Sequence, residues 1–218
     1  MTDPALAPNA PVHRQWRSLL EQASRLSLSP DTHEVERRFP ADAHANQWLG
    51  SNGAGEAEIG DLEDRLGRRL PPSYRSFLAV SNGWLHLNDT EGPLLGTDGV
   101  GWLRDLDPAF TELWSTTSHG VPDIPDEEYL VYGEEQDCVD VRREHFPHAL
   151  QISDWGDSAL LMLNPMIVNA EGEWEAWAFA SWYPGVYRYP SFWDLAVDLI
   201  TSDHPDADWG FLTPIAAA

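Results

Sequence analysis

The spacing of the apolar residues changes once along the chain, near Trp84, and this change limits the possible folds more than any other feature of the sequence. Before Trp84, apolar side chains repeat every three or four residues, which is typical of amphipathic helices. After it, they form short runs separated by Gly, Pro and Asp, which favours strands and turns. A last helical repeat begins at Ser191, a residue suited to an N-cap. The order predicts an α+β protein, in which N-terminal helices pack on a mostly antiparallel or mixed sheet with a C-terminal helix.

The most regular part of the helical half runs from Gly55 to Gly83 and contains two predicted helices. One apolar stripe predicts a helix from about Gly55 to Leu66, which Gly67 ends. A second helix begins at Pro71-Pro72, because proline is tolerated in a first turn, and stops at Asn82-Gly83, which suit a left-handed cap. We expect this motif to build the core rather than a site; it comprises Ile59, Leu62, Leu66, Gly67, Leu70, Pro71, Tyr74, Phe77, Leu78, Asn82 and Gly83.

The second half of the chain contains the predicted strands. Residues 174–182 alternate with period two but are apolar on both faces, as in a strand covered on both sides. Two other apolar runs flank the turn Asp154-Trp155-Gly156-Asp157 and predict a hairpin. Strands are expected within 92–101, 129–132, 150–153, 159–163, 174–182 and 186–189, and a short helix at 108–116.

Four segments are expected along the chain: a flexible tail (1–11), a helical extension (12–50), one α+β domain (51–203) and a C-terminal tail (204–218). The first sixteen residues lack the basic start and apolar stretch of a signal peptide, and no apolar run approaches the ~20 residues that cross a bilayer. The single cysteine, Cys138, forms no intramolecular disulfide. These features predict a cytoplasmic protein without a membrane partner.

The charge of the chain is strongly negative and unevenly distributed. Thirteen Arg and no Lys face 36 Asp and Glu, for a net charge of -23. Residues 1–75 carry nine Arg and eleven acids, whereas residues 76–218 carry four Arg and 25 acids. Nucleic acid is excluded as a partner, because its binding depends on Lys and Arg that neutralise phosphates. The negative field favours a basic protein partner, although solubility alone also accounts for acidity.

The motif from Glu58 to Leu78, EIGDLEDRLGRRLPPSYRSFL, followed by the SNGW of residues 81–84, resembles the opening signature of the SUKH superfamily. Residues 150–157 resemble its central strand pair, and the SFWDL of residues 191–195 resembles its terminal helix. The likeness covers roughly residues 55–201, and segments 1–50 and 121–148 have no counterpart in it. It implies a domain that, in many bacterial members, is an immunity protein that neutralises a toxin, and in fungal relatives a cell-wall and signalling regulator.

Signs of catalysis are weak. The sequence has no P-loop, no nucleophile elbow and no zinc-protease helix. His145 and His148 have the spacing of metal ligands, but Pro147 between them disfavours a regular helix. Carboxylate pairs such as Glu173 with Glu175 are expected to be solvated charges in so acidic a chain. We therefore predict a protein that is no enzyme and needs no cofactor or metal.

The favoured hypothesis is a non-catalytic immunity protein that covers the cationic cleft of a basic toxin. Its expected partner-binding residues are Asp126, Glu127, Glu128, Glu134, Glu135, Asp137, Asp154, Trp155 and Asp157. Trp and Tyr dominate protein interfaces, and nearby acids receive Arg or Lys from a partner. Two alternatives remain open: a regulatory or scaffold protein that uses the same surface for an endogenous client, and an enzyme with a carboxylate pair in a Trp-lined pocket.

Overall fold

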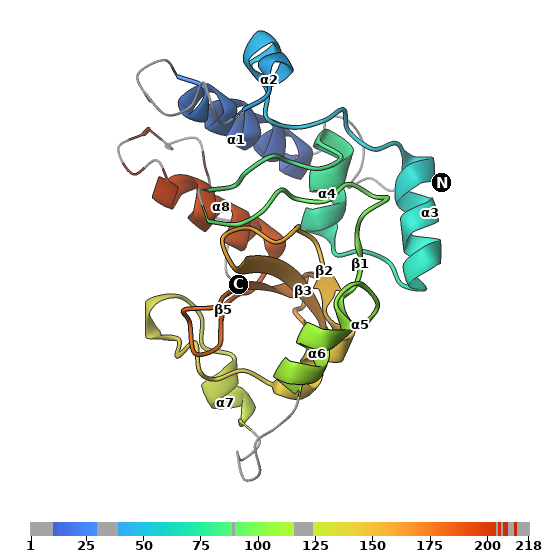
Figure 1. The fold of residues 1–218 in the computed structure, drawn as a ribbon, viewed down its shortest axis with the longest axis vertical. Coiled ribbons are helices and arrows are strands. Elements are labelled where there is room, and N and C mark those ends of the chain that lie inside the picture. The colour runs from blue at the N-terminus through green and yellow to red at the C-terminus, as the bar shows by residue number, and fades with distance from the viewer. Residues whose placement is uncertain are drawn as a thin grey trace.

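The computed structural model describes residues 11–29, 39–88, 90–115 and 124–203, with the single residues 205, 207, 208 and 212; at 11–14 only the backbone is described. Most of the two predicted tails, at 1–11 and 204–218, therefore lies outside the described residues. Figure 1 shows a central sheet with helices on both sides. The predicted α+β class is confirmed.

The sheet has five antiparallel strands in the order of the chain. Ala159 lies opposite Ala180 and Asn164 lies opposite Glu175, and the register shifts between Asn164 and Val168. The predicted hairpin around residues 154–157 is confirmed, because its two flanking strands pair with each other. The strands are β1 (Gly101–Trp102), β2 (Leu150–Gln151), β3 (Ala159–Val168), β4 (Trp174–Ala180) and β5 (Val186–Tyr189).

One face of the sheet is covered by helices from both ends of the chain (Figure 1). They are α1 (Pro11–Ser27), α3 (Glu56–Leu66), α4 (Pro72–Val80) and α8 (Phe192–Asp203), with α2 (Ala41–Asn46) beside α1. At their centre the fully buried ring of Trp16 lies 5.3 Å from that of Phe77, 5.4 Å from Phe192 and 4.8 Å from Trp193. The N-terminal extension thus packs into the main core through α1.

The other face is covered by shorter elements from the middle of the chain (Figure 1). Alternate side chains of β3 and β4, such as Met162 and Trp177, point into this second core, where they meet Phe146. Both faces of β4 are therefore buried, which explains why its sequence is apolar on both sides. The covering elements are α5 (Leu103–Leu106), α6 (Pro108–Ser115), α7 (Asp126–Tyr129) and the 3-10 turns η3 (Gly133–Glu135) and η4 (Arg143–His148).

Two local predictions need correction. Residues 129–132 form no strand, because Tyr129 ends the short helix α7. Helix α4 ends at Val80, and the next residue is extended; Gly83 has a positive φ of 104°, but Asn82 does not cap the helix. Its side chain instead accepts the backbone N–H of Thr97 at 2.7 Å, so Asn82 fixes a loop rather than a helix end.

The large apolar residues of the Gly55–Gly83 motif are buried, with exposed fractions of 7 % or less. Between its two helices, Gly67 has a left-handed φ of 66° and donates to carbonyls of the last turn of α3. No atom lies within 4 Å of a Cβ built on Gly67, so only its backbone conformation opposes a side chain.

Two glycine-to-alanine variants of α3 are expected to act in opposite directions. Gly67→Ala should lower the free energy of unfolding by about 1–2 kcal/mol, the cost of a left-handed residue with a Cβ. Gly60→Ala, inside the helix and with open space around its Cβ, should raise it by about 0.4–1 kcal/mol. Urea unfolding of both variants measures the difference. Equal changes in the free energy of unfolding would contradict the left-handed C-cap at Gly67.

Candidate functional site

The predicted partner-binding acids all lie at the surface. Asp126, Glu127, Glu128, Glu134, Glu135, Asp137, Asp154 and Asp157 are exposed, and we call these eight residues the acidic surface. Trp155, which was predicted to join them, is half-buried: its ring lies 5.1 Å from that of Phe110 and 6.0 Å from that of Phe179. Trp155 thus contributes mainly to the second core.

The acids of segment 126–137 are positioned by a buried carboxylate in β4. Glu175 is 1 % exposed, and its Oε2 accepts hydrogen bonds from the Tyr129 hydroxyl at 2.8 Å and from Trp177 Nε1 at 2.7 Å. Its Oε1 accepts from the Tyr132 hydroxyl at 3.2 Å. Burial, reinforced by the nearby Glu175 charge, raises the pKa of Tyr129 far above its ordinary value, so this hydroxyl stays a donor. Two tyrosines thereby bind residues 126–137, the acidic segment, to the sheet through hydrogen bonds.

A buried arginine in β5 completes this polar centre. Arg188 is fully buried; its Nη1 donates to the Tyr129 carbonyl and lies 3.8 Å from Glu175 Oε1. Its guanidinium carbon lies 4.2 Å from the centre of the Tyr129 ring, a cation–π distance. Among the described residues, its Nε and Nη2 have no hydrogen-bond partner. Tyr129 therefore contacts both members of a buried ion pair.

The rest of the segment lies along β5. Gln136 exchanges two hydrogen bonds with the backbone of Arg188, at 2.8 and 3.1 Å, and the Val186 N–H donates to the Cys138 carbonyl at 3.0 Å. Asp126 is held by Arg142 at 2.5 Å. The segment without a counterpart in the family resemblance is thus bound to the sheet by polar contacts at several points.

The prediction that Glu173 and Glu175 are solvated is wrong. Glu175 lies in the buried centre just described, and Glu173 accepts the N–H of Ser73 at 2.8 Å and its hydroxyl at 2.6 Å. The signal that could have revealed Glu175 was its place inside a strand apolar on both faces: a charge there has no water to face and needs buried partners.

The two histidines lie in different environments. His145 is buried, and burial lowers its pKa, which favours the neutral ring; its Nδ1 lies 3.1 Å from Asn164 Nδ2. His148 is exposed, and Pro147 sits between them in the 3-10 turn η4. Within the described ranges, no three His, Cys, Asp or Glu side chains are grouped as a metal ion requires.

Segment 126–137 of the acidic surface extends along β4, whereas the turn 154–157 lies near the end of that strand. Tyr129 of the first segment contacts Glu175 at the start of the strand, whereas Trp155 of the turn 154–157 packs on Phe179 near its end. Because Glu175 and Phe179 are four residues apart in a strand, they point to the same face. Both parts therefore border the second core, but they do not touch through these contacts.

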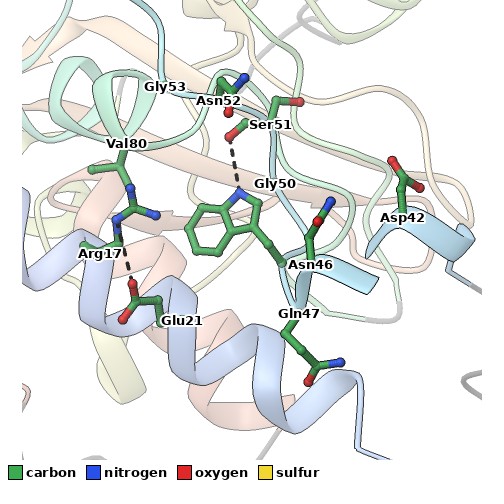
Figure 2. A pocket seen from close by; sticks show the side chains of 11 residues that line it. Arg17, Glu21, Asp42, Asn46, Gln47, Gly50, Ser51, Asn52, Gly53 and Val80 are labelled. Atoms are coloured by element: carbon green, nitrogen blue, oxygen red, sulfur yellow. Dashed lines mark hydrogen bonds and ion pairs between the residues drawn. The ribbon is translucent and has the colours of Figure 1, made fainter. Parts of the chain in front are cut away.

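A separate polar pocket of about 760 Å³ lies between α1, α2 and the loop that follows α2 (Figure 2). Its wall includes Trp48, whose Nε1 donates to the Ser51 carbonyl at 3.2 Å and whose ring lies 5.0 Å from the Arg17 guanidinium. Glu21 and Asp42 line it from different helices, but both are exposed. Acid–base catalysis requires a carboxyl in a dry environment, so this pocket does not favour the enzyme alternative.

The raised pKa values of three carboxyl groups predict how the free energy of unfolding depends on pH. Burial is the main cause that raises the pKa values of Glu91, Glu173 and Asp194 above the ordinary 4.5 for Glu and 3.8 for Asp. A raised pKa in the folded state means that the fold prefers the protonated form. These groups therefore stabilise the protein below their ordinary values, and this contribution is lost as the pH rises through their folded-state values.

Accordingly, these three carboxyl groups should add to the free energy of unfolding as the pH falls from 7 to about 5, and protonation also relieves the repulsion within a chain of charge -23. His145 acts in the opposite direction, because its lowered pKa makes the folded state bind a proton less readily than the unfolded chain. Urea titrations across this range measure the free energy of unfolding. Glu173→Gln should flatten the increase, whereas Glu171→Gln, at an exposed position in the same loop, serves as the control for a lost charge. A Glu173→Gln protein with the same pH dependence of stability as Glu171→Gln would contradict the assignment.

An antiparallel sheet covered on both faces by helices, with exposed carboxylates around its second core, defines an α+β domain with an acidic surface. A model of the SMI1/KNR4 family (SUKH-1) matches residues 53–197, more than half of the chain, and the chain belongs to this family. The family includes toxin immunity proteins, and its domains are generally non-catalytic immunity or regulatory modules that bind protein partners. No curated protein matches the chain. Among the described helices, none is long and apolar enough to span a membrane.

Proposed function

We propose that this protein is an immunity protein that binds a basic toxin domain through the acidic surface and prevents the toxin from reaching its substrate. The observation that carries the proposal is the exposure of all eight acids of that surface in a family that includes toxin immunity proteins. In the described parts of the chain, Asp126 is the only one of the eight that forms an ion pair with an arginine.

The charge supports this partner class. Residues 76–218 contain only four Arg against 25 acids, so the region has few cations of its own to neutralise the acidic surface. A cationic partner would be attracted over about a Debye length, ~8 Å at physiological salt, and its association would be faster by ~10 to 1000-fold. Inhibition would be stoichiometric, because the bound domain only blocks the toxin's cleft.

We further propose that the protein acts in the cytoplasm, where a toxin would meet its intracellular target. The chain has a single cysteine, Cys138, so it has no intramolecular disulfide that would require an oxidising compartment. Cell fractionation with an antibody against the chain tests this proposal, and recovery only from the outside of the cell would overturn it.

The experiment pairs this protein with toxin domains encoded in the same genome. Each domain is expressed from an inducible promoter with and without the protein, and its inactive variant is purified for calorimetric titration. We expect one basic domain to be lethal alone, tolerated in the presence of the protein, and bound at a 1:1 ratio. Growth inhibition by every domain despite co-expression, without measurable binding, would overturn the proposal.

A further inference from the structure

The turn between β4 and β5, residues 181–185, lies between the two parts of the acidic surface. On one side the Ser181 N–H donates to the Ser158 carbonyl at 3.0 Å, next to Asp157. On the other side the Val186 N–H donates to the Cys138 carbonyl at 3.0 Å, next to Asp137. The turn therefore joins two acidic segments that lie about twenty residues apart in the sequence.

The tip of this turn presents an exposed tryptophan. Trp182 is 52 % exposed, whereas the other tryptophans that the structure describes are buried or half-buried. Its ring lies 5.8 Å from that of Tyr183, which in turn lies 4.7 Å edge-to-face from Tyr187. The indole thus packs on Tyr183, which in turn packs on Tyr187, while about half of the indole surface remains exposed.

The exposed ring of Trp182 does not contribute to the packing of either core. Trp182 is the second residue after the end of β4 and belongs to neither core. Val139, 52 % exposed, follows Cys138 on the neighbouring segment and lies close to Gly185 of the turn. A second exposed apolar side chain therefore lies in the same area. Exposed apolar groups with a polar rim are typical of protein interaction sites, and Trp is the residue most enriched among binding hot spots.

The flanking charges define the partner. Asp137 and Asp157 are exposed, and in the described residues neither forms an ion pair. A partner that brought acids here would meet uncompensated like charges, whereas Arg or Lys on both sides of an apolar pocket would match the two flanks.

We propose that Trp182 is the anchor of the interface: it inserts into an apolar pocket of a basic protein whose Lys and Arg side chains contact Asp137 on one side and Asp157 on the other. This inference rests on the proposed function for the identity of that protein as a toxin. The anchor itself requires only a cationic protein partner.

The test compares two variants with exposed apolar residues removed. Trp182→Ala should weaken binding of the purified, inactive toxin domain by about 30-fold or more, the loss expected for a hot-spot side chain. Met166→Ala removes a side chain of similar exposure, 49 %, from the far end of β3 and should leave affinity within about twofold. Both should unfold at the wild-type temperature, because neither residue lies in a core.

The outcomes separate this inference from the proposed function. A toxin domain that binds the wild type and Trp182→Ala equally would overturn the anchor and leave the immunity role intact. If no toxin domain binds, the same variants are used as bait in a lysate of the producing cells, and each captured protein is identified, purified and titrated. A basic protein other than a toxin whose affinity depends on Trp182 supports the anchor and overturns immunity, whereas the absence of any such protein overturns both.

A spectroscopic readout locates the contact directly. The indole N–H signal of Trp182 is assigned by its absence from Trp182→Phe and followed during titration with the same domain. We expect it to shift or broaden more than the signal of Trp177, which is fully buried. An unchanged Trp182 signal at saturation would overturn the anchor.

Discussion

Replacement of Glu175 by alanine is expected to lower the free energy of unfolding by about 3–5 kcal/mol, because it leaves Arg188 as a buried charge without its counter-ion. The same change removes the acceptor shared by Tyr129, Trp177 and Asn164, whose donors lie 2.7 to 2.9 Å from Glu175 Oε2. Buried donors without an acceptor cost further stability. Urea unfolding at neutral pH measures the loss.

The local consequence distinguishes this mechanism from general destabilisation. Because Tyr129 and Tyr132 fasten the acidic segment to Glu175, amide hydrogen exchange should accelerate in residues 126–137 before it does in α3 or α4. Glu128→Ala, an exposed acid in the same helix, is the matched control and should change stability by less than about 0.5 kcal/mol. A Glu175→Ala protein as stable as the control would contradict the buried ion pair.

Replacement of Trp16 by alanine is expected to cost about 3–5 kcal/mol, the range for removal of a buried large aromatic side chain. The ring is fully buried among Phe77, Phe192 and Trp193, and its Nε1 donates to the Ser73 carbonyl at 3.0 Å. Helix α1 therefore connects the N-terminal extension to α4 and α8. Thermal or urea unfolding of Trp16→Ala measures this connection.

The control for Trp16 is a more accessible tryptophan of the same extension. Trp48 is only partly buried, against Trp84 and below Arg17, so Trp48→Ala should cost clearly less than Trp16→Ala. If Trp16→Ala were no more destabilising than Trp48→Ala, the extension would not be part of the main core, and residues 53–197 would carry the stability alone.

The regular elements could be predicted from the sequence because local patterns determine them. The stripe Ile59, Leu62 and Leu66 with Gly67 after it located α3 to within a residue, and the alternation from Trp174 located β4. Such patterns need no knowledge of distant partners, since helix and strand periods are set by the backbone itself. The family resemblance, which rested on the same local motifs, is confirmed.

The polar centre could not be predicted because its members are far apart in the sequence. Tyr129 and Glu175 are separated by 46 positions, and Arg188 and Tyr129 by 59. Within so acidic a chain, nothing local distinguishes Glu175 from a solvated glutamate except its strand, and the local pattern at Tyr129 and Tyr132 predicts a separate strand. Likewise, the sequence predicts Trp155 as a partner-binding residue without showing which tryptophans are exposed; packing on Phe110 and Phe179 half-buries Trp155, and among the described tryptophans Trp182 is the exposed one.

We expect binding of the toxin domain to depend on where the acids lie rather than on how many there are. Two variants that remove the same charge from different places test this expectation. One neutralises the acidic surface with Glu134→Gln, Glu135→Gln, Asp154→Asn and Asp157→Asn. The other neutralises four exposed acids elsewhere, with Asp42→Asn, Asp61→Asn, Asp64→Asn and Asp98→Asn.

The most direct measurement is the association rate of each variant with the inactive toxin domain, determined by stopped-flow at low and at physiological salt. We expect the acidic-surface variant to associate at least about tenfold more slowly than the wild type at low salt, with a weaker salt dependence, and the control variant to stay within about threefold of the wild type. Equal rates for the two variants would show that only net charge matters and would contradict an interface at the acidic surface.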